Sequence, residues 1–354
     1  MPKAYRPMRI VLGALTVFAV LFVLAGQGGW GPPAEIEQAL GEVSRWCERV
    51  SGGLLREPVN TLGNLGFVIA GLAMFSTLAR DTTHRRPAVN RFIGNSPVAL
   101  LYASAVVFLG PGSMVMHGTH TFVGAWIDNV SMVAYITIPL LLNLALLGRW
   151  SNRTFFTTYA LVLVSYAAGY WYLGPDLGVG FELFTVSIPL WIISEVVYRW
   201  WSPLVRVLSG FAGFGVAAVF GIFPAEMVAE ADRYWWVFLF WLPGVLARQP
   251  AEGRRRYTPW FWTGIASFLV AYAIWLTGTP EHPWCSPDSL IQAHAIWHLL
   301  SAVATWSFFM FLRTEQPVRV ETASPTPVQE PADQCMSPIP GSQDIIEEGH
   351  NLID

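Results

Sequence analysis

The chain has 354 residues, of which 53% are hydrophobic, 14% aromatic and only 13% charged, whereas about a quarter of the residues of a soluble domain are charged. This composition excludes an ordinary water-soluble globule, and the formal net charge of −3 gives no reason to expect a nucleic-acid partner. Apolar runs of about 15 to 25 residues recur along the chain. We therefore expect an all-α, multi-pass integral membrane protein.

Apolar stretches that could cross roughly 30 Å of hydrocarbon predict the helices in chain order. There are ten of them, near 10–26, 58–79, 97–118, 122–147, 155–173, 180–199, 205–223, 234–248, 259–277 and 290–312. The basic start of the chain and the small residues Ala25 and Gly26 also fit a cleaved signal peptide. We therefore treat residues 1–27 as a transmembrane helix or signal anchor, and residues 28–315 as a multi-span membrane domain.

The remaining segment, residues 316–354, is rich in Pro, Ser, Gln and acidic residues and has no long apolar run. Such a composition cannot bury enough apolar surface to form a core, so we expect a disordered cytoplasmic tail.

The loop charges predict the orientation of the ten spans. If both termini are cytoplasmic, most of the 21 Lys and Arg residues fall in cytoplasmic segments, as the positive-inside rule requires. The opposite side keeps only Arg45, Arg49, Arg56 and Arg233. If one span had been missed or added, the basic residues after that point in the chain would fall on the opposite side of the membrane, and the asymmetry would be lost.

Ionisable and polar side chains within the apolar spans point to function, because they are costly in a membrane. Four groups stand out, and the last three of them lie toward the predicted exoplasmic ends of their spans and can share one depth. They are Glu57, Asn60 and Asn64 on one helical face, Ser113 and His117 one turn apart, Asp128, and the i, i+4 pair His294 and His298.

Three of these residues, His117, His294 and His298, could fill three corners of a zinc tetrahedron and leave the fourth open for water, as in catalytic zinc sites. Zinc lowers the pKa of its bound water to about 7. Asp128 would then be a natural general base, and the Ser113 hydroxyl a natural donor to a developing oxyanion. This arrangement indicates hydrolysis of a carbonyl compound.

Other interpretations remain open at this point. A histidine in a membrane helix can simply hydrogen-bond to a neighbouring helix, and an Asp with several His residues can form the proton relay of a transporter. His120 is an alternative to His117 as a ligand, although it lies closer to the loop.

The motifs together resemble the alkaline ceramidases. These enzymes belong to a larger group of seven-helix membrane hydrolases, which also contains the adiponectin and progestin receptors and proteins of GPI-anchor lipid remodelling. The resemblance is carried by residues 46–132 and 284–302, through the motifs WCE at 46–48, EPVNTLGN at 57–64, GS at 112–113 with His117, Asp128, and CSPDSLIQAHAIWHLL at 285–300.

The resemblance implies a seven-helix hydrolase core, here with about three additional transmembrane helices. It implies a zinc ion on the three histidines already named, Asp128 as proton acceptor and Ser113 as oxyanion stabiliser. It also implies a disulfide between Cys47 and Cys285, which would leave Cys335 free in the cytoplasm.

In the enzymes resembled, an acidic segment before the first core helix holds a calcium ion. Trp46, Glu48 and Glu57 match that pattern, but Arg45 stands where an Asp is expected. A cation in place of an oxygen ligand argues against a calcium site.

The function that the resemblance implies is hydrolysis of the amide bond of ceramide or a related N-acyl lipid, giving a long-chain amine and a fatty acid. An ester-cleaving enzyme of lipid remodelling and a receptor of the adiponectin-receptor type are the alternatives. The membrane would be a bacterial inner membrane or an endomembrane of the ER or Golgi type.

Overall fold

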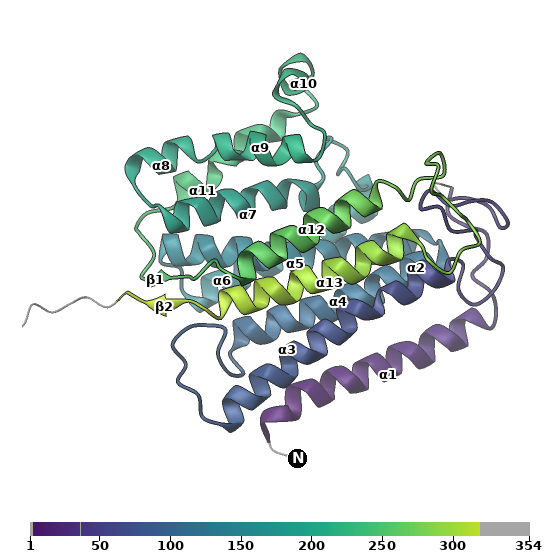
Figure 1. Ribbon diagram of the computed structural model, residues 1–354, viewed down its shortest axis with the longest axis horizontal. Coiled ribbons are helices and arrows are strands. Elements are labelled where there is room, and N and C mark those ends of the chain that lie inside the picture. Colours follow the sequence, from purple (N-terminus) through teal and green to yellow (C-terminus); the bar gives the residue numbers. More distant parts are fainter. Residues whose placement is uncertain (1–2, 36, 319–354) are drawn as a thin grey trace, which may run out of the picture. The chain divides into compact units, whose positions relative to one another are not determined.

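The computed structural model describes residues 3–35 and 37–318, and helices make up most of that part of the chain, with almost no strand (Figure 1). This confirms the all-α class. The elements are η1 (Lys3–Tyr5), α1 (Arg6–Gly26), α2 (Pro58–Gly63), α3 (Leu65–Thr83), α4 (Pro97–Thr119), α5 (Phe122–Gly148), α6 (Asn152–Leu173), α7 (Leu183–Arg199), α8 (Pro203–Leu208), α9 (Phe211–Val219), α10 (Pro224–Ala229), η2 (Trp235–Trp241), α11 (Leu242–Leu246), β1 (Gly253–Arg254), α12 (Trp260–Trp275), α13 (Ala293–Leu312) and β2 (Gln316–Pro317).

Several helices begin where a hydroxyl side chain can cap them. Ser96, Thr121 and Ser151 precede α4, α5 and α6, and each accepts a hydrogen bond from the amide three residues later. Such caps satisfy amide groups that have no partner within the helix. The chain turns sharply after α4 at His120, which adopts a left-handed conformation with φ of 48°.

Five helical segments are long and apolar enough to cross a membrane by length and composition: Lys3–Gly26, Pro58–Thr83, Pro97–Thr119, Phe122–Gly148 and Ala293–Leu312. They coincide with the predicted spans near 10–26, 58–79, 97–118, 122–147 and 290–312. The second segment is interrupted at Asn64, between α2 and α3. The predicted spans near 155–173, 180–199 and 259–277 correspond to α6, α7 and α12.

Two predicted spans are not single helices. The stretch 205–223 is divided between α8 and α9, and the stretch 234–248 between η2 and α11. Gly210 occupies the junction of α8 and α9, where a Cβ atom would lie 2.5 Å from the ring of Trp241. Glycine at this junction leaves room for that ring, which a side chain would displace.

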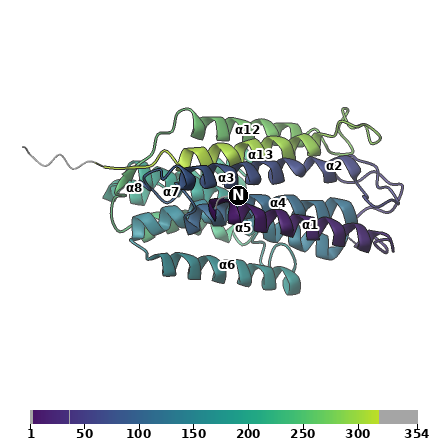
Figure 2. The ribbon, with the colours of Figure 1, turned by 90° about the horizontal axis from the view of Figure 1, so that it is seen from below.

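The helices form a bundle in which α12 and α6 lie on opposite faces, with α13, α4 and α5 between them (Figure 2). At one end of the bundle the loops contact one another: Asn95 donates to the carbonyl oxygen of Ala4 at 2.8 Å, and Asn90 donates to that of Arg313 at 3.1 Å. The N-terminal segment, the α3–α4 loop and the residues after α13 therefore meet at the same end, as the predicted topology requires.

At the other end, the segment 27–57 contacts two other loops. The amide of Ala34 donates to the carbonyl oxygen of His120 at 2.9 Å, and Arg49 forms an ion pair with Asp288 at 2.7 Å. This end holds the long loop before α2 and the loop between α12 and α13.

Residues 316–318, which the prediction assigned to the tail, contact the loop before α12. Gln316 and Pro317 form β2, which pairs with β1, and the amide of Val318 donates to the carbonyl oxygen of Glu252 at 2.8 Å. Residues 319–354, including Cys335, lie outside the described residues.

Candidate metal centre

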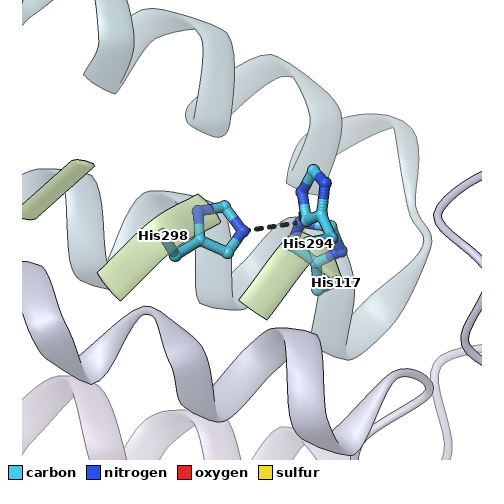
Figure 3. Close-up of side chains that lie close together, drawn as sticks. All are labelled: His117, His294 and His298. Carbon is cyan, nitrogen blue, oxygen red and sulfur yellow. Dashed lines mark hydrogen bonds between the residues drawn. The ribbon is translucent and has the colours of Figure 1, made fainter. Parts of the chain in front are cut away.

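The imidazoles of His117, His294 and His298 converge on one point (Figure 3). The Nε2 atom of His117 lies 3.1 Å from Nε2 of His294 and 3.3 Å from Nε2 of His298. All three side chains are buried. They come from two helices that are distant in sequence, α4 and α13.

The three nitrogen atoms fit a tetrahedral metal ion. Bonds of about 2.0–2.1 Å from zinc to histidine nitrogen place neighbouring ligand atoms about 3.3 Å apart, close to the separations observed. Neutral imidazole nitrogens that face one another in a buried site need a cation or a proton between them. The histidines can therefore hold a metal ion, and their donor chemistry suits zinc.

Close approach of helices brings these side chains together. A Cβ atom on Gly63 of α2 would lie 2.9 Å from Cα of Ala295, which lies between the two histidines of α13. A Cβ atom on Gly112 of α4 would lie 2.6 Å from Oγ of Ser131 on α5. Only glycine permits such contacts, so both positions set the spacing of the helices around the site.

Ser113 and Asp128 lie near the three histidines in the fold. Ser113 is buried one turn before His117, and Asp128 is half-buried on α5. Both line the same cavity as His294 and His298. The centre thus combines three potential metal ligands, a carboxylate and a hydroxyl.

The cavity next to the centre has a volume of about 1240 Å³ and extends along α13 and α7. Most of its lining is apolar, including Phe67, Ile188, Trp191, Phe261 and Phe308. A polar centre at one end of a long apolar cavity is suited to a molecule with a reactive polar group and an alkyl chain.

Glu57 lies directly behind His117. Its Oε2 atom accepts a hydrogen bond from Nδ1 of His117 at 2.5 Å, and its Oε1 atom lies 3.2 Å from Nε2 of His120. The Glu57 side chain is fully buried, and Asn60 donates to it at 3.2 Å. A carboxylate in this position fixes the orientation of a histidine and leaves its other nitrogen free for a metal.

The segment before α2 covers the centre. The ring of Trp46 lies 4.7 Å from that of His117 and 5.0 Å from that of His294. The adjacent Cys47 forms a disulfide with Cys285, in the loop before α13. The disulfide that the resemblance implied is therefore present, and it holds Trp46 over the histidines.

The predicted calcium ligands have protein partners. The Glu48 carboxylate accepts from the amides of Val59 and Asn60 at 2.7 and 2.8 Å, at the start of α2. Burial raises the pKa of Glu48, and those two amides oppose the shift. Because Glu57 contacts two histidines and Arg45 pairs with Glu37, these contacts argue against a calcium ion in the same place.

Sequence reasoning offered His120 only as an alternative to His117 as a metal ligand, whereas the structure places it outside the group of three converging histidines. It is buried beside Glu57, and Glu37 lies 3.8 Å from its Nδ1 atom. The only signal in the sequence was its spacing of three residues from His117, which is close to one helical turn. The direction of its side chain depends on the left-handed turn that ends α4.

A protein-family model described as Ceramidase matches residues 43–329 of the chain. No curated protein matches it significantly. The matched region includes every residue named in this subsection except Glu37.

Proposed function

This chain belongs to the ceramidase family, and on that premise we propose that it is a zinc-dependent intramembrane amidohydrolase. Its substrate is ceramide or a related N-acyl lipid, which it cleaves to a long-chain amine and a fatty acid. The observation that carries this proposal is the convergence of three buried histidine nitrogens at one end of a large, mostly apolar cavity.

His117, His294 and His298 are the proposed ligands of the zinc ion. A zinc ion with three protein ligands supplies a Lewis acid and makes a water molecule acidic near neutral pH. Glu57 holds the ring of His117 in position from behind, as its contact with Nδ1 allows.

Asp128 and Ser113 supply the remaining chemistry. The Asp128 carboxylate takes a proton from the attacking water and afterwards delivers it to the leaving nitrogen. The Ser113 hydroxyl donates a hydrogen bond to the carbonyl oxygen as negative charge develops on it. The amide C–N bond breaks, the water oxygen joins the acyl carbon, and the products are a fatty acid and an amine.

The segment before α2, which carries Trp46 and Cys47, supports the same proposal. Trp46 lies over the histidines and also lines the cavity, so it helps to keep bulk water away from the reacting group. The disulfide beside it holds that cover in place.

We further propose that both termini are cytoplasmic and that the centre lies near the exoplasmic side. The α3–α4 loop, which holds several arginines, and β1 lie at the end of the bundle opposite α2 and the loop before α13 (Figure 1). A disulfide needs an oxidising compartment. Labelling of Cys335 by a membrane-impermeant maleimide should therefore occur in inverted vesicles and not in right-side-out vesicles.

The deciding experiment uses purified protein, with His298→Ala as the control. Both proteins are incubated with a panel of ceramides, other N-acyl lipids and ester lipids, and the products are identified by mass spectrometry. The proposal predicts a long-chain amine and a fatty acid from the wild type alone. Cleavage of esters alone would contradict it and indicate lipid remodelling, and a zinc-loaded protein that cleaves nothing would favour a receptor.

A further inference from the structure

The cavity has a second polar end, far from the histidines. Glu195 and three arginines line it there: Arg199, the last residue of α7, and Arg255 and Arg256, in the loop before α12. The side chains of Arg199 and Arg256 are exposed. The proposed reaction assigns no role to either of them.

Contacts along α13 give the distance between the two ends. The guanidinium of Arg199 lies 4.2 Å from the ring centroid of Tyr257, and that ring lies 5.0 Å from the ring of Phe311. The helix from His298 to Phe311 is about 20 Å long at a rise of about 1.5 Å per residue. An extended alkyl chain of about 15 carbons spans that length, given C–C bonds of about 1.5 Å in a zigzag.

Arg199 and Arg256 differ from Arg255 in how their positive charge is balanced. Arg255 is buried and forms ion pairs with Glu195 and Glu315, both at 2.8 Å. Within residues 3–35 and 37–318, neither Arg199 nor Arg256 forms an ion pair. Arg255 is therefore held by the fold, whereas the other two guanidiniums can receive an anion.

Aromatic side chains place this end of the cavity near the membrane surface. Trp200 and Trp262 line it, and each is 58% exposed. Tryptophan gathers at the level of the lipid headgroups, and arginine at that level attracts anionic groups.

We propose that Arg199 and Arg256 bind the anionic headgroup, a carboxylate or phosphate, of a single-chain amphiphile whose alkyl chain occupies the cavity and points toward the histidines. The site is distinct from the hydrolytic centre. Binding itself does not depend on the proposed hydrolysis. Only one consequence rests on that function: a bound amphiphile, including the fatty acid product, would exclude the chain of the substrate.

Equilibrium binding tests the proposal directly. Tritiated palmitate is titrated against the full-length protein in phosphatidylcholine nanodiscs, with empty nanodiscs as background. The variants are Arg199→Gln with Arg256→Gln, the histidine variant His298→Ala, and Arg254→Gln. Arg254 is a matched control because it is an exposed arginine of the same loop region that does not line the cavity.

The double arginine variant should weaken palmitate binding by about 30-fold, as two interfacial arginines together are expected to do. Arg254→Gln should bind palmitate like the wild type, and His298→Ala should bind it more tightly than the double arginine variant does. Competition by hexadecyl phosphate as well as palmitate would show that charge on an alkyl chain is what is recognised. Competition by palmitate alone would restrict the site to carboxylates.

Three results would overturn the proposal. One is equal binding in the double variant and the Arg254→Gln control. Another is loss of binding in His298→Ala alone, which would place the carboxylate at the histidines. The third is equally strong competition by hexadecanol, which carries no charge. A protein that hydrolyses no N-acyl lipid leaves all these outcomes readable, so the two proposals fail independently.

Discussion

Replacing Glu57 with glutamine tests whether the carboxylate behind His117 prepares that histidine for a metal. The substitution keeps the shape of the side chain but removes its negative charge. In the structure the carboxylate is fully buried and contacts Nδ1 of His117 at 2.5 Å and Nε2 of His120 at 3.2 Å. A neutral amide would hold the ring of His117 less firmly and make its Nε2 atom a weaker donor to a metal.

Loss of such a supporting group typically weakens metal binding by about 10- to 100-fold, or about 1.4–2.8 kcal/mol. We expect Glu57→Gln to fall in that range, because Asn60 still donates to the side chain and the three histidines remain. Activity should be low at limiting zinc and should recover largely when zinc is added.

The assay is competition for zinc against a chelator of known affinity, with the metal content of the purified protein as a second readout. Glu48→Gln is the control, since Glu48 is also a buried acid of this segment but bonds to the start of α2. It should lower the melting temperature and leave zinc affinity near that of the wild type. A zinc affinity of Glu57→Gln within twofold of the wild type would refute the reasoning.

The other predictions concern the centre and its supports. His298→Ala should lose zinc and activity together, as metal analysis and product analysis would show; retention of stoichiometric zinc would remove it from the ligand set. Ser113→Ala should keep zinc but lose about 10²- to 10³-fold in turnover, and full turnover would exclude an oxyanion role. Gly112→Ala should lower stability by about 1–3 kcal/mol, because its Cβ atom would meet Ser131 at 2.6 Å. In α1, Gly13→Ala meets nothing within 4 Å and should be neutral in the same thermal assay. Cys47→Ser should remove a reducible bridge, visible as unchanged mobility with and without reductant, and should lower the melting temperature.

The sequence was sufficient for the helices whose apolar runs are long and uninterrupted, because a run of that length has few alternatives to a membrane helix. It also predicted which histidines meet. His294 and His298 share a face of one helix, and the direction of each span placed His117 at the same depth. The disulfide and the specific function needed the resemblance, since spacing alone does not pair cysteines.

Other features depend on tertiary contacts that no local pattern encodes. The need for glycine at position 210 arises from the ring of Trp241 in η2, which packs against it. Glu57 matched a calcium pattern in sequence, but the fold directs its carboxylate to His117. The arginine end of the cavity was also missed, because Arg199 and Arg256 look like ordinary positive-inside charges until α7 and α12 bring them to one cavity.

The bridge between Cys47 and Cys285 joins positions 238 residues apart in the chain, and so closes most of the bundle into a covalent ring. The segment that covers His117 and the loop that leads into His294 and His298 belong to the same ring. In a membrane, helices are held together by packing rather than by exclusion from water, so α4 and α13 can separate without either leaving the bilayer. The ring limits how far they can drift apart. Removal of the metal should therefore be readily reversible in the oxidised protein. In the reduced protein, metal rebinding should be slower because α4 and α13 must first reassociate.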